Sequence, residues 1–132
     1  MSVKNKKQYL ISELAEEFDI TPRSIRYYEK QGLLSPGRTN GNYRIFTGKD
    51  RARLRLVLRG KRFGYSLEEI KEMIGYWHSE PEEITQIRKS LAYGEKKLLE
   101  IRNKIDELKW LEEDLQAVRD RLLKRLEELE KS

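Results

Sequence analysis

The last third of the chain carries a repeat of apolar residues that only a long helix with a partner can bury. Large aliphatic residues recur from position 84 to position 108 at alternating spacings of three and four, interrupted only by Gly94. This is the heptad pattern of a coiled-coil seam. A lone helix has nothing to pack against such a stripe, so the pattern predicts dimerisation through these seam residues: Ile84, Ile87, Leu91, Leu98, Ile101, Ile105 and Leu108.

The apolar pattern continues toward the C-terminus after a change of phase. Leu111 follows Leu108 after three residues, where the alternation requires four. Such a step indicates either local overwinding of the helix or a break into a separate helix near residues 112–116. We therefore expect a coiled-coil dimerisation helix over residues 82–111, entered through Pro81, and a C-terminal helical tail over residues 112–132. The tail either packs back on its own dimer or extends past it to contact another molecule.

Charge is distributed unevenly between the two parts of the chain. With 39% charged and 37% hydrophobic residues, the 132 residues are too polar for a single compact globule. Residues 1–78 contain 16 Lys and Arg against 9 Asp and Glu, whereas residues 79–132 contain 12 against 14. This asymmetry predicts a small basic domain that binds nucleic acid, followed by an extended charged helix with a different role.

The stretch from Thr21 to Leu34 predicts a short helix with two unlike faces. Thr21 is a suitable N-cap, Pro22 a suitable first helical residue, and Gly32 can adopt the left-handed conformation that ends the helix. At about 100° per residue, the face of the helix expected to pack against the rest of the domain contains Ile25, Tyr28 and Glu29. The opposite face contains Arg23, Arg26, Tyr27 and Lys30. This second face is either an ordinary solvated surface or a surface that contacts a polyanion.

A preceding helix completes a helix-turn-helix. Ser12 is its expected N-cap, Leu14, Ala15 and Phe18 form its apolar face, and the turn follows at residues 19–20. Two short helices joined by so tight a turn can place the second helix in a major groove, although helix pairs of this kind also occur in proteins that do not bind DNA.

Residues 38–47 predict a small β-hairpin, or wing. Asn40-Gly41 lies between short extended segments, and both residues tolerate the positive φ that tight hairpin turns require. The cations and the tyrosine that flank the turn are Arg38, Tyr43 and Arg44. The hairpin either carries these groups to a ligand or caps the core through Ile45 and Phe46.

Two more helices follow the wing. Asp50 is the expected cap of a helix over residues 51–62, with Leu54, Val57 and Leu58 buried. Between Arg38 and Arg62 there are nine cations and one acid, which favours phosphate contact over a solvated face of mixed sign. A near-capping box that starts at Ser66 predicts a further helix over residues 67–77, whose core side consists of Leu67, Ile70 and Ile74. The turn between these helices offers Lys61 and Arg62 to a DNA backbone.

The run from Tyr9 to Trp77 resembles the DNA-binding domain of the MerR family of bacterial transcription regulators. The matching blocks are ISELAEEFDITPRSIRYYEKQGLL, the wing NYRIFT, the segment DRARLRLVLRGKRFGYSLEEI and the long helix after it. The resemblance implies a mainly α fold. We expect a flexible basic arm over residues 1–8, a winged helix-turn-helix domain over residues 9–78, and dimerisation through an antiparallel coiled coil.

The resemblance also implies a function. Such dimers bind a dyad operator inside a promoter whose spacer between the two promoter elements is long. In response to an effector, they bend and untwist the DNA so that RNA polymerase can use both elements. Some members act mainly as repressors. By position, DNA contact carries over to Arg23, Arg26, Tyr27, Tyr43 and Arg44, and less directly to Lys61 and Arg62. With Lys30 and Arg38, which lie on the same predicted surfaces, these are the expected DNA-binding residues. Tyr28 corresponds to a packing tyrosine.

The effector is the least constrained part of the prediction. The chain has no cysteine and a single histidine, His78, so we expect no metal site and no cofactor. Metal-sensing relatives use cysteines near the dimerisation helix, and drug-sensing relatives add a large ligand domain for which the helical C-terminal region leaves no room. A small organic effector would have to bind between subunits. The aromatic residues that either line such a crevice or pack in the core are Tyr76, Trp77, Tyr93 and Trp110.

Other function classes are less compatible with the sequence. The carboxylates are scattered and there is no glycine-rich phosphate loop, so an enzyme is not expected. The sequence contains no apolar run long enough to cross a bilayer, and the start MSVKNKKQ has no apolar signal region, so we expect a cytoplasmic protein. The alternative from another class is an architectural or scaffold protein that bridges DNA segments or binds a partner through its coiled coil.

Overall fold

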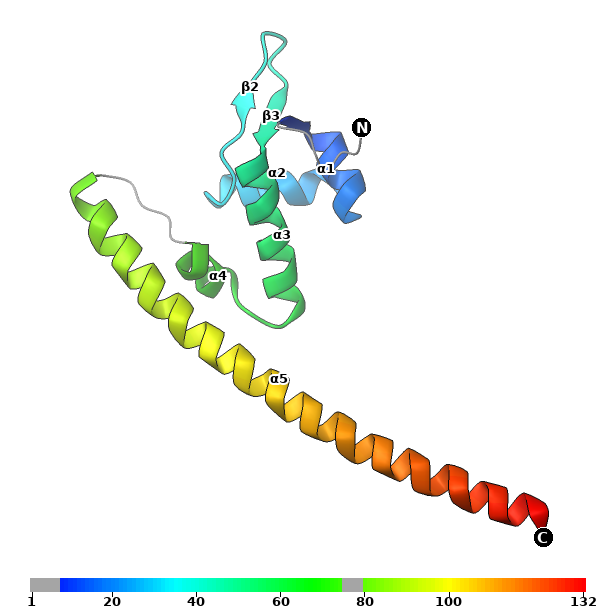
Figure 1. Ribbon diagram of the computed structural model, residues 1–132. Helices are drawn as coiled ribbons and strands as arrows, with labels where there is room; N and C mark the ends of the chain where they lie inside the picture. Colours follow the sequence, from blue (N-terminus) through cyan, green and yellow to red (C-terminus); the bar gives the residue numbers. More distant parts are fainter. Residues whose placement is uncertain (1–7, 75–79) are drawn as a thin grey trace. The chain divides into compact units, whose positions relative to one another are not determined.

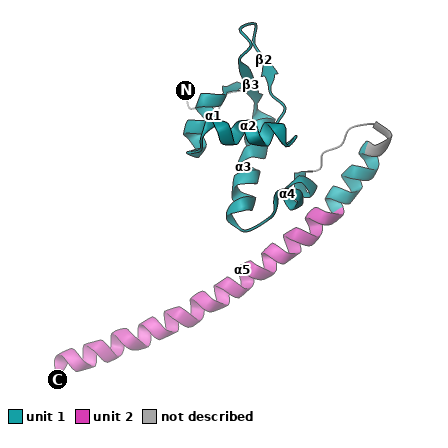
Figure 2. Ribbon diagram, turned by 180° about the vertical axis from the view of Figure 1, so that it is seen from behind, with its two compact units in different colours: residues 1–91 teal, residues 92–132 magenta. Residues whose placement is uncertain are grey.

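The structure, a computed structural model, describes residues 8–74 and 80–132 (Figure 1). The chain divides into two compact units, residues 1–91 and residues 92–132 (Figure 2). The first unit contains three strands, the helices α1 to α4 and the beginning of α5, and the second contains the remainder of α5. The predicted basic arm, except for Gln8, and the predicted helical residues 75–77 lie outside the described residues.

A three-stranded antiparallel sheet forms one side of the first unit. The strands β1 (Gln8–Leu10), β2 (Gly37–Arg38) and β3 (Arg44–Thr47) lie in the order β1-β3-β2. Tyr9 pairs with Phe46, and both side chains are buried. The wing is therefore not an isolated hairpin, because β3 is the central strand of a sheet whose first strand sequence reasoning left unassigned.

The wing turn differs in detail from the prediction. Within residues 37–47 the positive φ belongs to Asn42 (63°), and neither Asn40 nor Gly41 has one. The N–H of Asn42 donates to the carbonyl of Thr39 at 2.9 Å, and the N–H of Thr39 donates to the carbonyl of Tyr43 at 2.9 Å. This is a longer loop in which one residue in the left-handed region closes the turn, instead of a two-residue Asn-Gly turn.

The helices α1 (Ile11–Phe18) and α2 (Pro22–Lys30) form the predicted helix-turn-helix. Ser12 is not the N-cap of α1, because the helix begins one residue before it and the carboxylate of Glu13 accepts from the N–H of Leu10 at 2.8 Å. The cap of α2 is as predicted, since Thr21 Oγ1 accepts from the N–H of Ser24 at 3.1 Å. Gly32, with a φ of +82°, turns the chain after α2.

Helix α3 (Gly48–Arg62) begins earlier than predicted, because Thr47 and not Asp50 is its N-cap. The hydroxyl of Thr47 accepts from the N–H of Asp50 at 3.1 Å, and the Asp50 carboxylate accepts from the N–H of Thr47 at 3.0 Å. Asp50 is buried, and its other oxygen accepts from the N–H of Ser35 at 3.0 Å. This carboxylate therefore closes a capping box and also ties the loop after α2 to the start of α3.

Helix α4 (Leu67–Ile74) starts with the predicted capping box. Ser66 Oγ accepts from the N–H of Glu69 at 3.1 Å, and the Glu69 carboxylate accepts from the N–H of Ser66 at 3.0 Å. Gly60 allows α4 to approach α3 closely, because a Cβ on Gly60 would lie 3.0 Å from the side chain of Ile70.

Two adjoining apolar clusters hold the first unit together. The larger consists of buried residues from the sheet, α1, α2, α3 and the loop after α2: Tyr9, Leu14, Ala15, Ile25, Leu34, Phe46 and Leu54. The smaller joins α3, α4 and the same loop through Leu33, Val57 and Ile70. Tyr28 packs against both clusters, as its resemblance to a packing tyrosine implied.

Helix α5 (Glu80–Lys131) is a single helix of 52 residues. It continues through residues 112–116, so the change in apolar phase does not break the helix. Every residue from 101 to 132 is exposed. No helix among the described residues is long and apolar enough to cross a membrane.

Candidate nucleic-acid interface

The outer face of α2 presents the side chains that sequence reasoning assigned to DNA. All four are exposed in the first unit: Arg23, Arg26, Tyr27 and Lys30. The opposite side of the same helix is anchored, because Ile25 is fully buried and Tyr28 is half-buried. Burial raises the pKa of the Tyr28 phenol above its ordinary value, and the neighbouring Tyr27 acts in the same direction. The helix is therefore held from one side and offers cations and a phenol on the other.

The wing exposes two of its three predicted contact residues. The ring of Tyr43 is 70% exposed, and Arg38 is exposed at the other side of the loop. Arg38 Nη1 donates to the carbonyl of Asn42 at 3.4 Å, a long contact that orients the guanidinium along the loop. Both groups lie where a ligand in contact with the wing would meet them.

The third wing residue, Arg44, is tied to α2. Its Nε donates to Glu29 Oε1 at 2.6 Å, and the two side chains are 26% and 23% exposed. Sequence reasoning placed Arg44 among the DNA contacts and missed this ion pair. The pair connects the base of the wing to the helix that carries Arg26 and Tyr27, so Arg44 positions the wing relative to α2.

Arg51 also has a structural partner, which corrects the interpretation of the basic region. Its Nε donates to both carboxylate oxygens of Glu17 at 2.9 Å, its Nη2 donates to Oε2, and its guanidinium lies 5.8 Å from the ring centroid of Tyr9. The hydrogen bond to Glu17 raises the pKa of Arg51. Of the nine cations between Arg38 and Arg62, this one joins α3 to α1 and β1 instead of facing a phosphate.

The turn between α3 and α4 presents the last two predicted cations. Lys61 and Arg62 are exposed at the end of α3, and Phe63 beside them is 77% exposed. Gly64, with a φ of +88°, allows the reversal of the chain, and the N–H of Tyr65 donates to the carbonyl of Gly60 at 3.0 Å. The sequence indicated the cations and the glycines, but it gave no sign that Phe63 points into solvent.

The predicted dimerisation residues share one exposed stripe of α5. Their side chains are between 37% and 64% exposed, although they are among the most apolar of the chain: Ile84, Ile87, Leu91, Leu98, Ile101, Ile105 and Leu108. Within the described part of the chain nothing buries them fully. A stripe of this length needs a second helix.

The candidate effector residues are only partly placed. Tyr76, Trp77 and His78 lie outside the described residues. Tyr93 is half-buried and its ring lies 5.2 Å from Lys97 Nζ, whereas Trp110 is 61% exposed. In residues 8–74 and 80–132, no group of three His, Asp or Glu side chains could hold a metal ion.

Comparisons with known proteins agree with the geometry. Residues 9–77 match the MerR HTH family regulatory protein model, and residues 51–118 match the MerR DNA-binding model. The transcriptional regulator ZntR of Escherichia coli K12 is 35% identical over 113 residues, which are 85% of this chain and 79% of ZntR. The regulator CueR of Salmonella typhimurium is 31% identical over 114 residues, or 86% of this chain and 75% of CueR.

A solved structure shows the same fold over most of the chain. A MerR family transcriptional regulator from Listeria monocytogenes superposes with a TM-score of 0.69 over 93% of this chain and 95% of its own, at 23% sequence identity. ZntR and CueR are transcription regulators, and this does not favour the architectural alternative. The mainly helical fold with a small sheet wing and a long final helix is thereby confirmed, and the chain belongs to the MerR family of DNA-binding transcription regulators.

Proposed function

We propose that the chain binds, as a homodimer, a dyad operator in a promoter spacer and switches transcription by distorting the DNA. The observation that carries this proposal is the outer face of α2, where Arg23, Arg26, Tyr27 and Lys30 are exposed while the inner face is locked into the core. A helix held in this way can enter a major groove without rearrangement, and its arginines can reach base edges.

Other exposed groups of the first unit are suited to contact the DNA on either side of that helix. Arg38 and Tyr43 in the wing, and Lys61 and Arg62 after α3, are suited to the phosphate backbone and contribute affinity that falls with salt. Contacts on both sides of a helix in the groove can hold a duplex in a bent or untwisted shape. Deformability of the operator then adds specificity at base pairs that no side chain touches.

The exposed apolar stripe of α5 forms the dimer interface. The two-fold symmetry of the dimer matches that of the operator. Two identical domains joined by an isologous interface read two identical half-sites in opposite orientations. We propose an antiparallel coiled coil for this interface. RNA polymerase would bind the distorted promoter differently from the undistorted one. A small organic effector bound between the subunits, near Tyr93 or Trp110, would shift the equilibrium between two shapes of the complex.

Selection from a pool of randomised duplexes tests the proposal. The full-length chain, at low ionic strength, should enrich an inverted repeat, and the Arg26→Ala variant should enrich it far less. Enrichment of sequences without dyad symmetry, or no enrichment, would contradict a dimer that reads two half-sites.

A gel-mobility assay tests distortion separately. The selected operator is placed at different positions within fragments of equal length. A bent complex migrates slowest when the operator is central. Equal mobility at every position would remove bending from the mechanism while leaving operator binding in place, and footprinting with RNA polymerase would show whether the polymerase contacts are altered.

A further inference from the structure

We propose that Phe63 is a further DNA-binding residue, whose ring packs on the deoxyribose of the backbone beside the phosphates bound by Lys61 and Arg62. The contact is apolar, so it adds affinity that does not depend on salt, and it favours deoxyribose over ribose. This inference deepens the proposed function, on which it rests. Three observations carry it: the exposure of the ring, the rigidity of the turn and the charge around it.

Phe63 is the most exposed large hydrophobic residue in the described part of the chain. Its exposed fraction is 77%, and the next highest is that of Tyr43 in the wing, at 70%. Phenylalanine is among the residues most often buried in proteins, because its ring has no polar group. Each of these two exposed rings is next to an arginine in the sequence, Arg62 or Arg44. The turn after α3 therefore presents an aromatic ring beside a cation, as the wing does.

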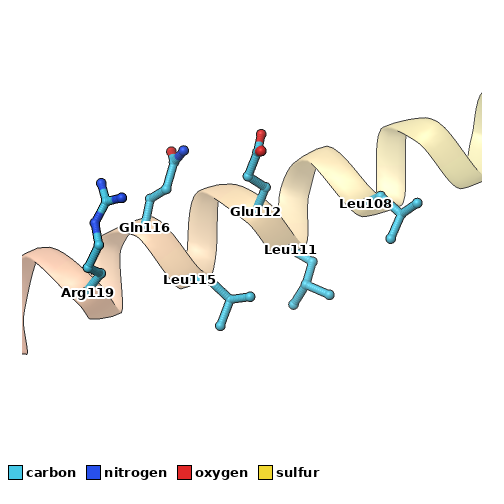
Figure 3. Close-up of a pocket in the computed structure, with 6 residues that line it drawn as sticks. All are labelled: Leu108, Leu111, Glu112, Leu115, Gln116 and Arg119. Atoms are coloured by element: carbon cyan, nitrogen blue, oxygen red, sulfur yellow. The ribbon is translucent and has the colours of Figure 1, made fainter.

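The other exposed apolar side chains are largely explained by the proposed dimer. In α5 they form the dimerisation stripe and its continuation. Figure 3 shows Leu108, Leu111 and Leu115 pointing to one side of that helix, where they line an open groove. Phe63 lies outside this stripe, and it is not a member of either apolar cluster of the described chain. Neither the core nor the proposed interface accounts for its ring.

The turn that carries Phe63 is held by backbone hydrogen bonds. The N–H of Phe63 donates to the carbonyls of Arg59 and Gly60, at 3.2 and 3.1 Å. The N–H of Gly64 donates to the carbonyl of Lys61 at 3.1 Å, and the φ of Gly64 is +88°. None of these bonds uses the side chain of Phe63, so the turn itself does not require an aromatic residue there. The ring is presented on a fixed backbone, which limits the entropy lost on binding.

The surroundings of the ring are positively charged. Lys61 and Arg62 precede it and are exposed, and Arg59 is exposed on the preceding turn of α3. Residues 51–67 contain six cations and no acid. Such a segment is attracted to a phosphate backbone. The sugars are the apolar parts of that backbone, so a ring next to phosphate-binding cations meets deoxyribose.

An apolar contact differs from an ionic one in two measurable ways. A ring that packs on a sugar releases no counterion, so it leaves the slope of log affinity against log salt unchanged. A 2′-hydroxyl on the contacted sugar would be removed from water without a hydrogen-bond partner, so ribose is disfavoured. Phe63 therefore provides a discrimination between DNA and RNA that the charges of Lys61 and Arg62 do not provide.

A salt titration of side-chain variants tests the contact. Phe63→Ala in the full-length chain should raise the dissociation constant for the selected operator about tenfold at every salt concentration, because each dimer loses two rings. Phe63→Leu keeps most of the apolar area and should bind within about threefold of the wild type. The matched control is Lys61→Ala, which should instead lower the salt slope by about one per subunit.

Measurements without DNA separate the contact from a structural role. Because the ring is exposed, Phe63→Ala should leave the unfolding midpoint and the dimer dissociation constant of the free protein unchanged. A dimer dissociation constant raised as much as the operator constant would show that the ring packs against the second subunit, and would overturn the inference. A reduced salt slope in Phe63→Ala would also overturn it, because the ring would then act only through the neighbouring cations.

A scan with single ribonucleotides locates the contacted sugar. Each deoxyribonucleotide of the selected operator is replaced in turn, and the wild type and Phe63→Ala are titrated against every duplex. At one or two neighbouring positions in each half-site the ribonucleotide should weaken wild-type binding about fivefold. Phe63→Ala should bind those duplexes as tightly as it binds the unmodified operator, because the two changes remove the same contact.

The remaining outcomes separate this inference from the proposed function. Ribonucleotides that affect both proteins equally at every position, or an operator affinity unchanged in Phe63→Ala, would overturn the sugar contact. Operator binding through α2 would then stand. A wild-type chain that selects no inverted repeat would instead contradict the proposed function.

Discussion

The core of the first unit and the helix α5 bury their apolar residues in different ways. In the first unit Leu14, Ile25, Phe46 and Leu54 are fully buried by residues of the same chain. In α5 the large aliphatic residues from Ile84 to Leu129 remain between 37% and 65% exposed. A domain that fills its own core can fold alone, whereas a long helix with an open stripe depends on a second copy. With the proposed homodimer, folding and assembly therefore depend on separate parts of the chain.

Ion pairs show the same contrast. In the first unit Glu17–Arg51 and Glu29–Arg44 join elements that are far apart in the sequence. The pairs in the C-terminal part of α5, such as Glu127–Lys131, connect residues within about one helical turn. Local pairs of this kind stabilise a helix by only about 0.2–0.5 kcal/mol each and specify no tertiary contact. The first set of ion pairs fixes the positions of elements that carry the candidate DNA-binding residues.

The largest effect is expected from charges placed in the seam of α5. Leu98→Asp with Ile101→Asp should weaken dimerisation by on the order of 5 kcal/mol or more, because four carboxylates per dimer would have to be desolvated without partners. Sedimentation velocity should show a monomer with a folded first unit. The matched control, Lys96→Asp with Asn103→Asp, changes two positions outside the predicted seam and should remain a dimer. A dimer that persists in the seam variant would place the interface elsewhere.

A cavity in the first unit should destabilise that unit without preventing dimerisation, the reverse of the effect expected from the seam variant. Phe46→Ala removes a fully buried ring from the central strand and should lower the free energy of unfolding of that unit by about 3–5 kcal/mol. Thermal unfolding monitored by near-ultraviolet circular dichroism measures the loss. Association through α5 should survive, so a variant that became monomeric at a temperature where its first unit is folded would contradict the division of roles.

Loss of an outer α2 side chain should affect binding and not folding. Arg26→Ala should reduce specific affinity by about 1–3 kcal/mol per half-site, as expected for an arginine that contacts a base edge. Gel-shift titration with the selected operator measures it. Arg121→Ala, which removes the same charge from α5, is the matched control and should bind almost as the wild type does. Equal losses in both variants would indicate only a general effect of net charge.

The smallest effect is expected at the ion pair between the wing and α2. Glu29→Gln should lower the free energy of unfolding by less than about 1 kcal/mol, because the pair is partly solvated. It should also strengthen binding to random duplexes and steepen the salt dependence by about one counterion, since Arg44 is released toward phosphate. Glu72→Gln on α4 is the control for net charge. Weaker binding of random DNA by Glu29→Gln would mean that orientation of the wing matters more than the released charge.

Local sequence signals predicted most of the first unit. Thr21-Pro22, Gly32 and the box at Ser66 were placed correctly because cap chemistry acts over three or four residues and can be recognised in a short stretch. The wrong assignments, Ser12 and Asp50 as caps, placed the starts of α1 and α3 too late. In both cases a carboxylate one turn into the helix reached back to the preceding backbone, so the helix began earlier.

Contacts between distant segments could not be predicted from one sequence. The pairing of β1 with β3, and the ion pairs that engage Arg44 and Arg51, join residues 15 to 39 positions apart. Periodicity indicates that a cation is exposed or buried, but it does not indicate which carboxylate faces it. For α5 the period predicted the seam, and only the structure shows that the helix continues through the change of phase.

The stoichiometry of the DNA complex tests the central claim most directly. Sedimentation of the full-length chain with a labelled duplex that carries the selected inverted repeat should give two chains per duplex. Replacing one half-site by unrelated sequence should reduce affinity by at least about a hundredfold, since each lost base contact costs about 1–3 kcal/mol and several are lost together. One chain per duplex, with affinity unchanged when a half-site is removed, would contradict a dimer that presents two α2 helices to DNA.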